Sequence, residues 1–290
     1  MTGKAFQITT AKHHLSLVLF FLFFFSTLIP AAIAQEGKHY NFPEVFIDAE
    51  VYEDGSLRIS EERTFSFSGS FSEAWIDIYL EPGQEIRDVQ VSENGIPYQP
   101  VESKSDISSN VSVYYHDLSP RTYDSIYWSY RALDERKTFI ISYTVIDAVT
   151  VYDDIAELYW QFIGEGWDAR TGKVLVNLSL PSSVAPDDLY VFGHGPRSGQ
   201  VEIAGPGEVT WKVSALPANT FLEGRVLFPP EIVPRASIRI NENKLSAILA
   251  EERAMAFQTD LARFFIPVLI ILFLTLMLKE HLEKKTQALA

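Results

Sequence analysis

The sequence predicts a mainly β protein with two antiparallel β-sandwich-like units outside the membrane, then a stalk helix and one transmembrane helix. Three observations support this prediction. Apolar runs lie near both ends, short alternating runs fill the region between them, and a helical pattern without Gly or Pro appears only at residues 245–260. Short alternating runs separated by turn residues, with no helices between them, are typical of antiparallel sandwiches rather than βαβ units.

Residues 1–34 have the features of a secretory signal peptide. Lys4 and Lys12 precede the apolar run 15–29, and the small residues of Ala32-Ile33-Ala34 follow it. This order predicts cleavage after Ala34. An uncleaved signal anchor is the alternative, because the apolar run is long for a signal peptide.

Residues 35–156 are expected to form an N-terminal β unit. Asp54-Gly55 separates two alternating segments within residues 46–67, which is a strong hairpin signal. Glu61 and Arg63 fall on the same alternate positions as the apolar residues after this turn, the positions expected to face the core. Either the strand leaves the core there or a bulge resets its register.

Residues 157–240 are expected to form a second, Ig-like β-sandwich unit with alternating runs at 174–180 and 209–213. The stretch ELYWQFIGEGWD, residues 157–168, is interpreted as the junction between the two units. Trp160 would pack inward and Trp167 would close the base of the second unit. Gly164 and Gly166 would let the chain turn.

Residues 193–199, GHGPRSG, predict a tight turn. The glycines at Gly193, Gly195 and Gly199 suit positive φ, and Pro196 fixes a turn. His194 is a candidate ligand or base in this loop. A phosphate cradle would need a following helix N-terminus, whereas the residues that follow have a strand pattern.

Residues 241–261 are expected to form a membrane-proximal helix, 262–278 a transmembrane helix and 279–290 a cytoplasmic tail. The segment from Leu261 to Leu278 contains eighteen residues and one charge, Arg263, which is short for a bilayer span. A buried core helix is the alternative. Lysines after the segment favour a cytoplasmic C-terminus, with the bulk of the chain extracytoplasmic at the plasma membrane.

Charge and cysteine usage limit the classes of function. The chain has 24 basic and 38 acidic residues, and residues 35–260 have 18 and 36, a net charge of −18. This charge disfavours nucleic acid and anionic lipid headgroups as partners. The absence of cysteine excludes disulfides, a thiolate nucleophile and a Cys-based metal site, and favours a prokaryotic envelope protein.

Catalytic signatures are mostly absent. No G-x-S-x-G, H-E-x-x-H, P-loop or EF-hand pattern occurs, so we expect no cofactor and no metal. A Ser–His–Asp triad assembled from distant residues stays open. Acids beside Trp160 and Trp167 resemble what a glycosidase needs, although a solvated acidic loop beside core tryptophans explains them more simply.

Four segments in order carry a resemblance to a known family: DGSLRISEERTFSFSGSF, then TFIISYTVIDAV continuing through AELYWQFIGEGWD, then GHGPRSG, then RVLFPP. Over residues 40–260 the chain resembles the exported N-terminal region of the domain of unknown function 2207 family of prokaryotic membrane proteins. The resemblance implies a signal peptide, a β-rich extracytoplasmic region and membrane helices. It implies no established activity.

Two functional hypotheses follow. The preferred one is a non-enzymatic binding or assembly module that acts on an envelope or membrane protein partner. The alternative is an envelope glycan hydrolase that uses carboxylates near Trp160 and Trp167, so a glycan ligand stays open. The candidate binding residues are Trp160, Trp167, His194, Glu157 and Asp168.

Overall fold

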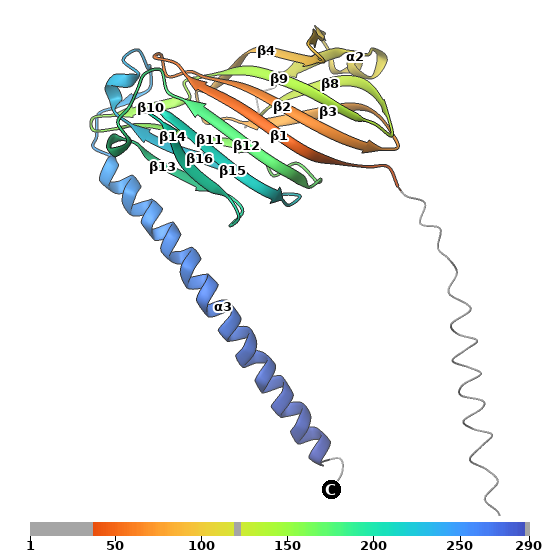
Figure 1. Cartoon of the computed structure of the whole chain (residues 1–290), viewed down its shortest axis with the longest axis vertical. Coiled ribbons are helices and arrows are strands. Elements are labelled where there is room, and N and C mark those ends of the chain that lie inside the picture. Colours follow the sequence, from red (N-terminus) through yellow and green to blue (C-terminus); the bar gives the residue numbers. More distant parts are fainter. Residues whose placement is uncertain (1–36, 119–122, 288–290) are drawn as a thin grey trace, which may run out of the picture. The chain divides into compact units, whose positions relative to one another are not determined.

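The computed structural model describes residues 37–118 and 123–287, without the side chains of 259–264, 266 and 280–287 (Figure 1). The expected signal peptide at residues 1–34 lies outside the described residues. The fold lies in the unit Tyr40–Ala290. Most of the described chain outside the C-terminal helix is β-strand, which confirms the predicted fold class at this level.

Eight of the described strands form one sheet, in the order β14-β15-β12-β1-β2-β9-β4-β5 (Figure 1). Their bounds in this order are Gln200–Gly205, Glu208–Leu216, Thr171–Ser179, His39–Val51, Leu57–Ser68, Arg136–Ile146, Glu85–Glu93 and Ile96–Pro97. Buried and exposed residues alternate along β2 and β12, so one face of this sheet packs against a core.

Two smaller sheets face the eight-stranded sheet. The first has the order β13-β16-β11-β10-β17, and the second the order β3-β8-β7-β6. The first comprises Tyr190–His194, Leu222–Phe228, Ala156–Ile163, Val149–Tyr152 and Arg239–Ile240, and the second comprises Ser70–Tyr79, Tyr123–Leu133, Val113–Asp117 and Gln99–Pro100. The helical segments are α2 (Lys104–Ser109), α3 (Leu245–Gln287), η1 (Pro186–Asp188) and η2 (Pro230–Ile232).

Aromatic side chains join each small sheet to the large one. Trp211 of β15 packs against Phe162 of β11, with ring centroids 5.2 Å apart. Trp128 of β8 packs against Phe139 of β9 at 5.8 Å. Buried residues from all three sheets belong to one continuous apolar cluster. The β layers therefore share a core across the predicted boundary at residue 157.

The eight-stranded sheet contains strands from both sides of that boundary. β1 pairs in parallel with β12, with Val45 opposite Val174, and β12 pairs with β15. The structure thus joins into one sheet the segments that the sequence pattern divided into two sandwich-like units. An alternating pattern reveals which face of a strand is buried, but it does not name the neighbouring strand.

The hairpin predicted at Asp54-Gly55 is present between β1 and β2. Gly55 has φ +80° and Asp54 accepts hydrogen bonds from Ser56. Neither alternative for Glu61 and Arg63 is correct. β2 keeps an unbroken register with β9, and both side chains point inward as an ion pair that is about 2% exposed.

α3 begins where the sequence predicts a helix. The backbone N–H groups of Lys244 and Leu245 donate to the carboxylate of Asp154, which caps the helix from the β10–β11 loop. Ile248 is buried against Leu227 of β16. Pro267 lies inside the helix, which continues without interruption to Gln287. Among the described residues, none of the helices combines the length and the apolar character that a membrane span requires.

Candidate functional site

A buried ion cluster joins α3 to the five-stranded sheet. Arg225 of β16 donates from Nε to Glu157 of β11 at 2.6 Å and from Nη1 to Glu252 of α3 at 2.9 Å. These three residues are between 6% and 9% exposed, whereas Glu251, at 3.2 Å from Arg225, is open to solvent. Arg225 pairs with both buried carboxylates, so each buried charge of the cluster has a partner of opposite sign in this low-dielectric site.

The pKa of Arg225 reflects these contacts. Burial by itself lowers the pKa of this guanidinium, whereas the hydrogen bond to Glu252 and the charge of Glu157 raise it. The net shift is upward, so Arg225 stays charged and holds α3 on the sheet.

A chain of hydrogen bonds continues from this cluster toward the surface. His194 Nε2 lies 3.0 Å from Glu252, and His194 Nδ1 lies 3.2 Å from the Tyr159 hydroxyl. Tyr159 donates to Glu223 at 2.8 Å, and Gln161 donates to the other oxygen of Glu223 at 3.2 Å. Partial burial and the bond to Glu223 raise the pKa of Tyr159. The hydroxyl therefore stays protonated and keeps its role as a donor.

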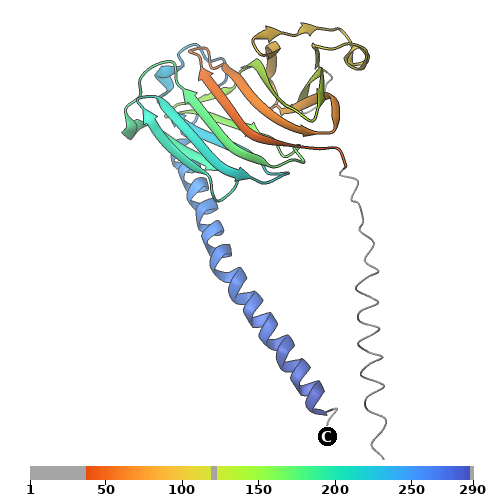
Figure 2. The same ribbon diagram turned by 45° about the vertical axis from the view of Figure 1, so that its right-hand side comes forward.

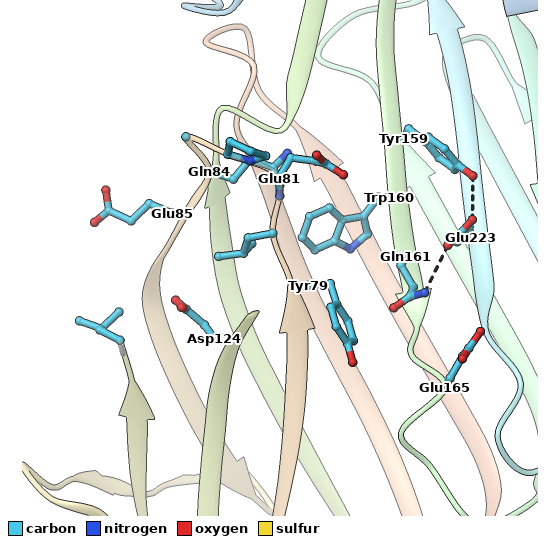
Figure 3. Close-up of a pocket in the computed structure, with 14 residues that line it drawn as sticks. Tyr79, Glu81, Gln84, Glu85, Asp124, Tyr159, Trp160, Gln161, Glu165 and Glu223 are labelled. Carbon is cyan, nitrogen blue, oxygen red and sulfur yellow. Dashed lines mark hydrogen bonds between the residues drawn. The ribbon is translucent and has the colours of Figure 1, made fainter. Parts of the chain in front are cut away.

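This series of hydrogen bonds ends in a groove of about 1080 Å³. One wall comes from the end of β3 and its connection to β4, and the other from β11 and β16 (Figure 3). Figure 3 shows Trp160 between the two walls, with Tyr79, Glu81 and Gln84 on one side and Tyr159 and Glu223 on the other. The groove is lined by Tyr79, Leu80, Glu81, Pro82, Gly83, Gln84, Glu85, Leu118, Asp124, Tyr159, Trp160, Gln161, Glu165 and Glu223.

Two features of this groove distinguish it from an ordinary surface hollow. Its described lining has five acidic side chains and no Lys or Arg. Trp160 is only 4% exposed, and its Nε1 has no hydrogen-bond partner among the described residues. Buried polar groups are normally hydrogen-bonded, so a ligand that displaces the side chains over this N–H would gain a hydrogen bond from it.

The structure brings together only part of the residue set predicted from the sequence. Glu157 and His194 join the same network through Arg225 and Glu252, and Trp160 lies beside it in the groove.

Trp167 and Asp168 lie apart from this network. Trp167 packs on Phe42 at 4.8 Å under the guanidinium of Arg63, and Asp168 accepts a hydrogen bond from Tyr40 at 2.6 Å.

The predicted turn residues lie in connections or at a strand end. Gly164 and Gly166 lie between β11 and β12, Gly193 is in β13, and Gly195, Pro196 and Gly199 form the β13–β14 turn. Gly195 has φ +148°, and a Cβ there would lie 2.7 Å from the Phe221 carbonyl oxygen. A side chain at this position would therefore be strained.

Sequence reasoning missed Arg225, Glu252, Tyr159 and Glu223. One signal was present, because Arg225 directly precedes the apolar run 226–228, which is followed by two prolines. A charge inside a buried strand requires a partner of opposite charge. Its partners lie in β11 and α3, far away in the sequence, so no local pattern names them.

Comparison with known proteins identifies a family. The family model described as "Predicted membrane protein (DUF2207) N-terminal domain" matches residues 42–228. The search among curated proteins finds no match.

Solved structures are similar only at the level of weak fold likeness. A candidate protease from Parabacteroides distasonis has 12% identity and a TM-score of 0.38, covering 66% of this chain and 40% of that one. A candidate nutrient-binding protein from Legionella pneumophila has 9% identity and a TM-score of 0.37, covering 65% and 67%. An M1 zinc metallopeptidase from Deinococcus radiodurans has 10% identity and a TM-score of 0.35, covering 64% and 42%. The chain thus spans less than half the length of two of them.

Proposed function

Because the chain belongs to the DUF2207 family of predicted membrane proteins, we propose that it is a single-pass membrane protein with an extracytoplasmic β-rich binding module. In this proposal residues 262–278 cross the plasma membrane, the tail 279–290 is cytoplasmic, and the groove receives a ligand outside the cell. The module acts by binding an envelope or membrane protein rather than by catalysis.

The apolar surface of α3 supports the membrane anchor. The seven consecutive residues 268–274 are all apolar, and each is between 48% and 61% exposed. Seven consecutive helical positions cover every face of a helix. A helix that is apolar all round needs an apolar environment on all sides, which a bilayer supplies.

The observation that carries the binding role is the hydrogen-bonded connection from the groove to α3. Glu223 and Tyr159 line the groove, and Tyr159 contacts His194, which contacts Glu252 on α3. The part of this network formed by Arg225, Glu157 and Glu252 is buried, and buried hydrogen-bonded networks hold their elements in one arrangement. A groove fixed in this way to an anchoring helix suits a module that presents its binding surface at a defined distance from the membrane.

The placement of the carboxylates favours this role over the glycan hydrolase hypothesis. Glu157 is bound by Arg225 and Asp168 by Tyr40, and Trp160 is buried. A glycosidase needs two carboxyl groups that face each other across the substrate. Glu157 and Asp168 are thus engaged in separate contacts, whereas Glu165, the third acid beside the two tryptophans, lines the groove.

Membrane fractionation and protease treatment of intact cells test the proposal. We expect the full-length chain to stay with membranes after an alkaline carbonate wash, and external protease to remove the β body. A photo-crosslinking residue at Tyr79 should give a discrete adduct in intact cells, whereas one at Arg58 on the large sheet should not. Release by carbonate, a protected body or equal adducts at both positions would contradict the proposal.

A further inference from the structure

We propose that the groove binds an extended polypeptide segment that carries Lys or Arg side chains. The inference rests on the proposed binding function and names its ligand class. In the described part of the chain three features of the groove support it: the edge strand β3 beside the part of β11 beyond its ladder with β10, a concentration of negative charge beside exposed tyrosines, and the indole N–H of Trp160, which lacks a hydrogen-bond partner.

The groove lies between β3, an edge strand, and the part of β11 beyond its ladder with β10. β3 is the first strand of its sheet and pairs with β8 on one side. The ladder between β10 and β11 ends at Leu158, so among the described residues 159–163 pair only with β16. A Cβ placed on Gly164 would lie 3.9 Å from the Asp77 carbonyl oxygen, so the two strands approach each other at that end. The groove is the part where they diverge.

Such edges bind extended chains. Backbone N–H and C=O groups outside a ladder form hydrogen bonds with an added strand, and alternate side chains of that strand enter pockets on either side. The volume of about 1080 Å³ exceeds that of one amino acid and lies at the upper end for small-ligand sites. Edge geometry therefore favours a polypeptide over a small molecule.

The negative charge of the groove favours a ligand with basic side chains. Glu81 and Glu165 form no ion pair in the described part of the chain, and Glu223 receives hydrogen bonds from the neutral donors Tyr159 and Gln161. Three of the acids have cationic or titratable partners, since Glu85 pairs with Arg87, Asp124 contacts His116, and His194 Nδ1 lies 3.9 Å from Glu223. Three carboxylates thus gather in one groove without a lysine or arginine, which attracts a positively charged ligand.

Tyrosine rings add a second attraction for cations. Tyr79 is 55% exposed and Tyr159 is 44% exposed at opposite walls. Arg225 lies over one face of the Tyr159 ring at 5.1 Å, so Tyr79 is the ring more open to a cation of the ligand. Lys and Arg are attracted to aromatic faces at such distances.

The indole N–H of Trp160, beside the groove, lacks a hydrogen-bond acceptor among the described residues. Trp160 Nε1 is a donor, and a bare cation or a simple amine cannot satisfy it. A polypeptide supplies both partners, because its backbone carbonyls accept and its basic side chains carry charge. An extended basic segment thus matches all three features.

Fluorescence anisotropy with the full-length chain in nanodiscs tests this inference. The probe is a labelled peptide of alternating Lys and Val, and the matched control is the same peptide with Glu in place of Lys. We expect the basic peptide to bind and the acidic one not to. Glu81→Gln with Glu165→Gln should weaken binding roughly tenfold. Glu62→Gln, the same change at an exposed position of β2, should leave binding unchanged.

Three results would overturn the inference: equal binding of both peptides, no effect of the double variant, or displacement of the peptide by spermidine at equal concentration of charge. The last result would indicate a site for simple cations. Trp160→Phe keeps a ring and removes the N–H, so it should weaken binding several-fold and destabilise the protein less than Trp160→Ala does. Unchanged binding of the basic peptide by this variant would show that no backbone carbonyl of the peptide accepts a hydrogen bond from Trp160 Nε1.

The same preparations separate failure of this inference from failure of the proposed function. A chain that stays anchored with its body outside, crosslinks at Tyr79 and ignores basic peptides refutes only the ligand class. A chain that fails the fractionation and protease tests refutes the membrane-anchored module itself.

Discussion

Trp160 and Trp167 lie only seven positions apart in the sequence, but their environments differ. Trp160 is 4% exposed, whereas Trp167 is half-buried against Phe42 and Arg63. Trp160→Ala should lower the free energy of unfolding by about 3–5 kcal/mol, the usual cost of emptying a large aromatic site. Trp167→Ala should cost less. Denaturant unfolding of the purified variants measures both, and equal losses would contradict the difference in burial.

The raised pKa of Tyr143 predicts how the stability of the protein changes at alkaline pH. Burial, followed by the charge of Glu61, raises the pKa of this hydroxyl well above its usual value. The unfolded tyrosine releases its proton near pH 10, whereas the folded one keeps it, so the folded state binds more protons above that pH. The contribution of Tyr143 to stability is therefore complete below about pH 10 and is lost as the pH rises further.

Denaturant unfolding combined with tyrosinate absorbance measures this effect. We expect the unfolding midpoint to fall steadily above about pH 10, with buried tyrosines titrating only as the protein unfolds. Tyr98 and Tyr130 have pKa values raised by the same cause, burial, and should titrate with it. Normal titration of all tyrosines in the folded protein would contradict this account.

The alternation of inward and outward side chains along a strand explains both the success and the failure of sequence reasoning at single residues. It correctly predicts that Trp160 packs inward, because Trp160 shares its face with apolar neighbours. It fails at Glu61 and Arg63, because burial of charge depends on a partner. Arg63 bonds Glu61, and Tyr143 of the neighbouring strand donates to Glu61 at 2.7 Å. Only the register of β2 with β9 brings that hydroxyl into position.

At the scale of elements, the Arg225 cluster fixes the start of α3 on the five-stranded sheet. Arg225→Met would leave Glu157 and Glu252 buried without a cation, which costs about 3–5 kcal/mol. Hydrogen exchange of residues 245–252 should become faster in this variant, because α3 loses its main polar contact with the sheet.

A triple variant controls for the loss of packing. Glu157→Gln, Arg225→Met and Glu252→Gln together remove all three charges, so most of the lost stability should return. If the single and triple variants are equally destabilised, packing of the Arg225 side chain rather than charge compensation holds the helix.

Elements with a clear local signal were predictable, whereas their contacts were not. The Asp54-Gly55 turn, the strands with alternating patterns and the helix beginning at Leu245 all match local signals. The candidate site depends on β11, β13, β16 and α3 meeting in space. The four residues that sequence reasoning missed are polar positions whose partners come from other elements, so no local pattern marks them.

At the scale of the whole molecule, the pairing of β1 with β12 determines how the β layers fold. β1 and β2 come from the N-terminal half, whereas β12, β15 and β14 come from the C-terminal half, and all belong to one sheet. Cutting the chain at the predicted boundary would expose one edge of β1 and one edge of β12. It would also separate β11 from the strand that precedes it, β10.

Residues 37–156 and 157–258 expressed separately should therefore lack cooperative unfolding. Each fragment would leave apolar core residues exposed, since residues of both halves form one buried cluster. Mixing the fragments should restore β structure and a single unfolding transition, because the β1–β12 ladder and the shared core re-form. Circular dichroism and tryptophan fluorescence of each fragment and of the mixture measure this. A fragment that unfolds cooperatively by itself would show that its half is an independent domain, in agreement with the division at residue 157 and against a single folding unit.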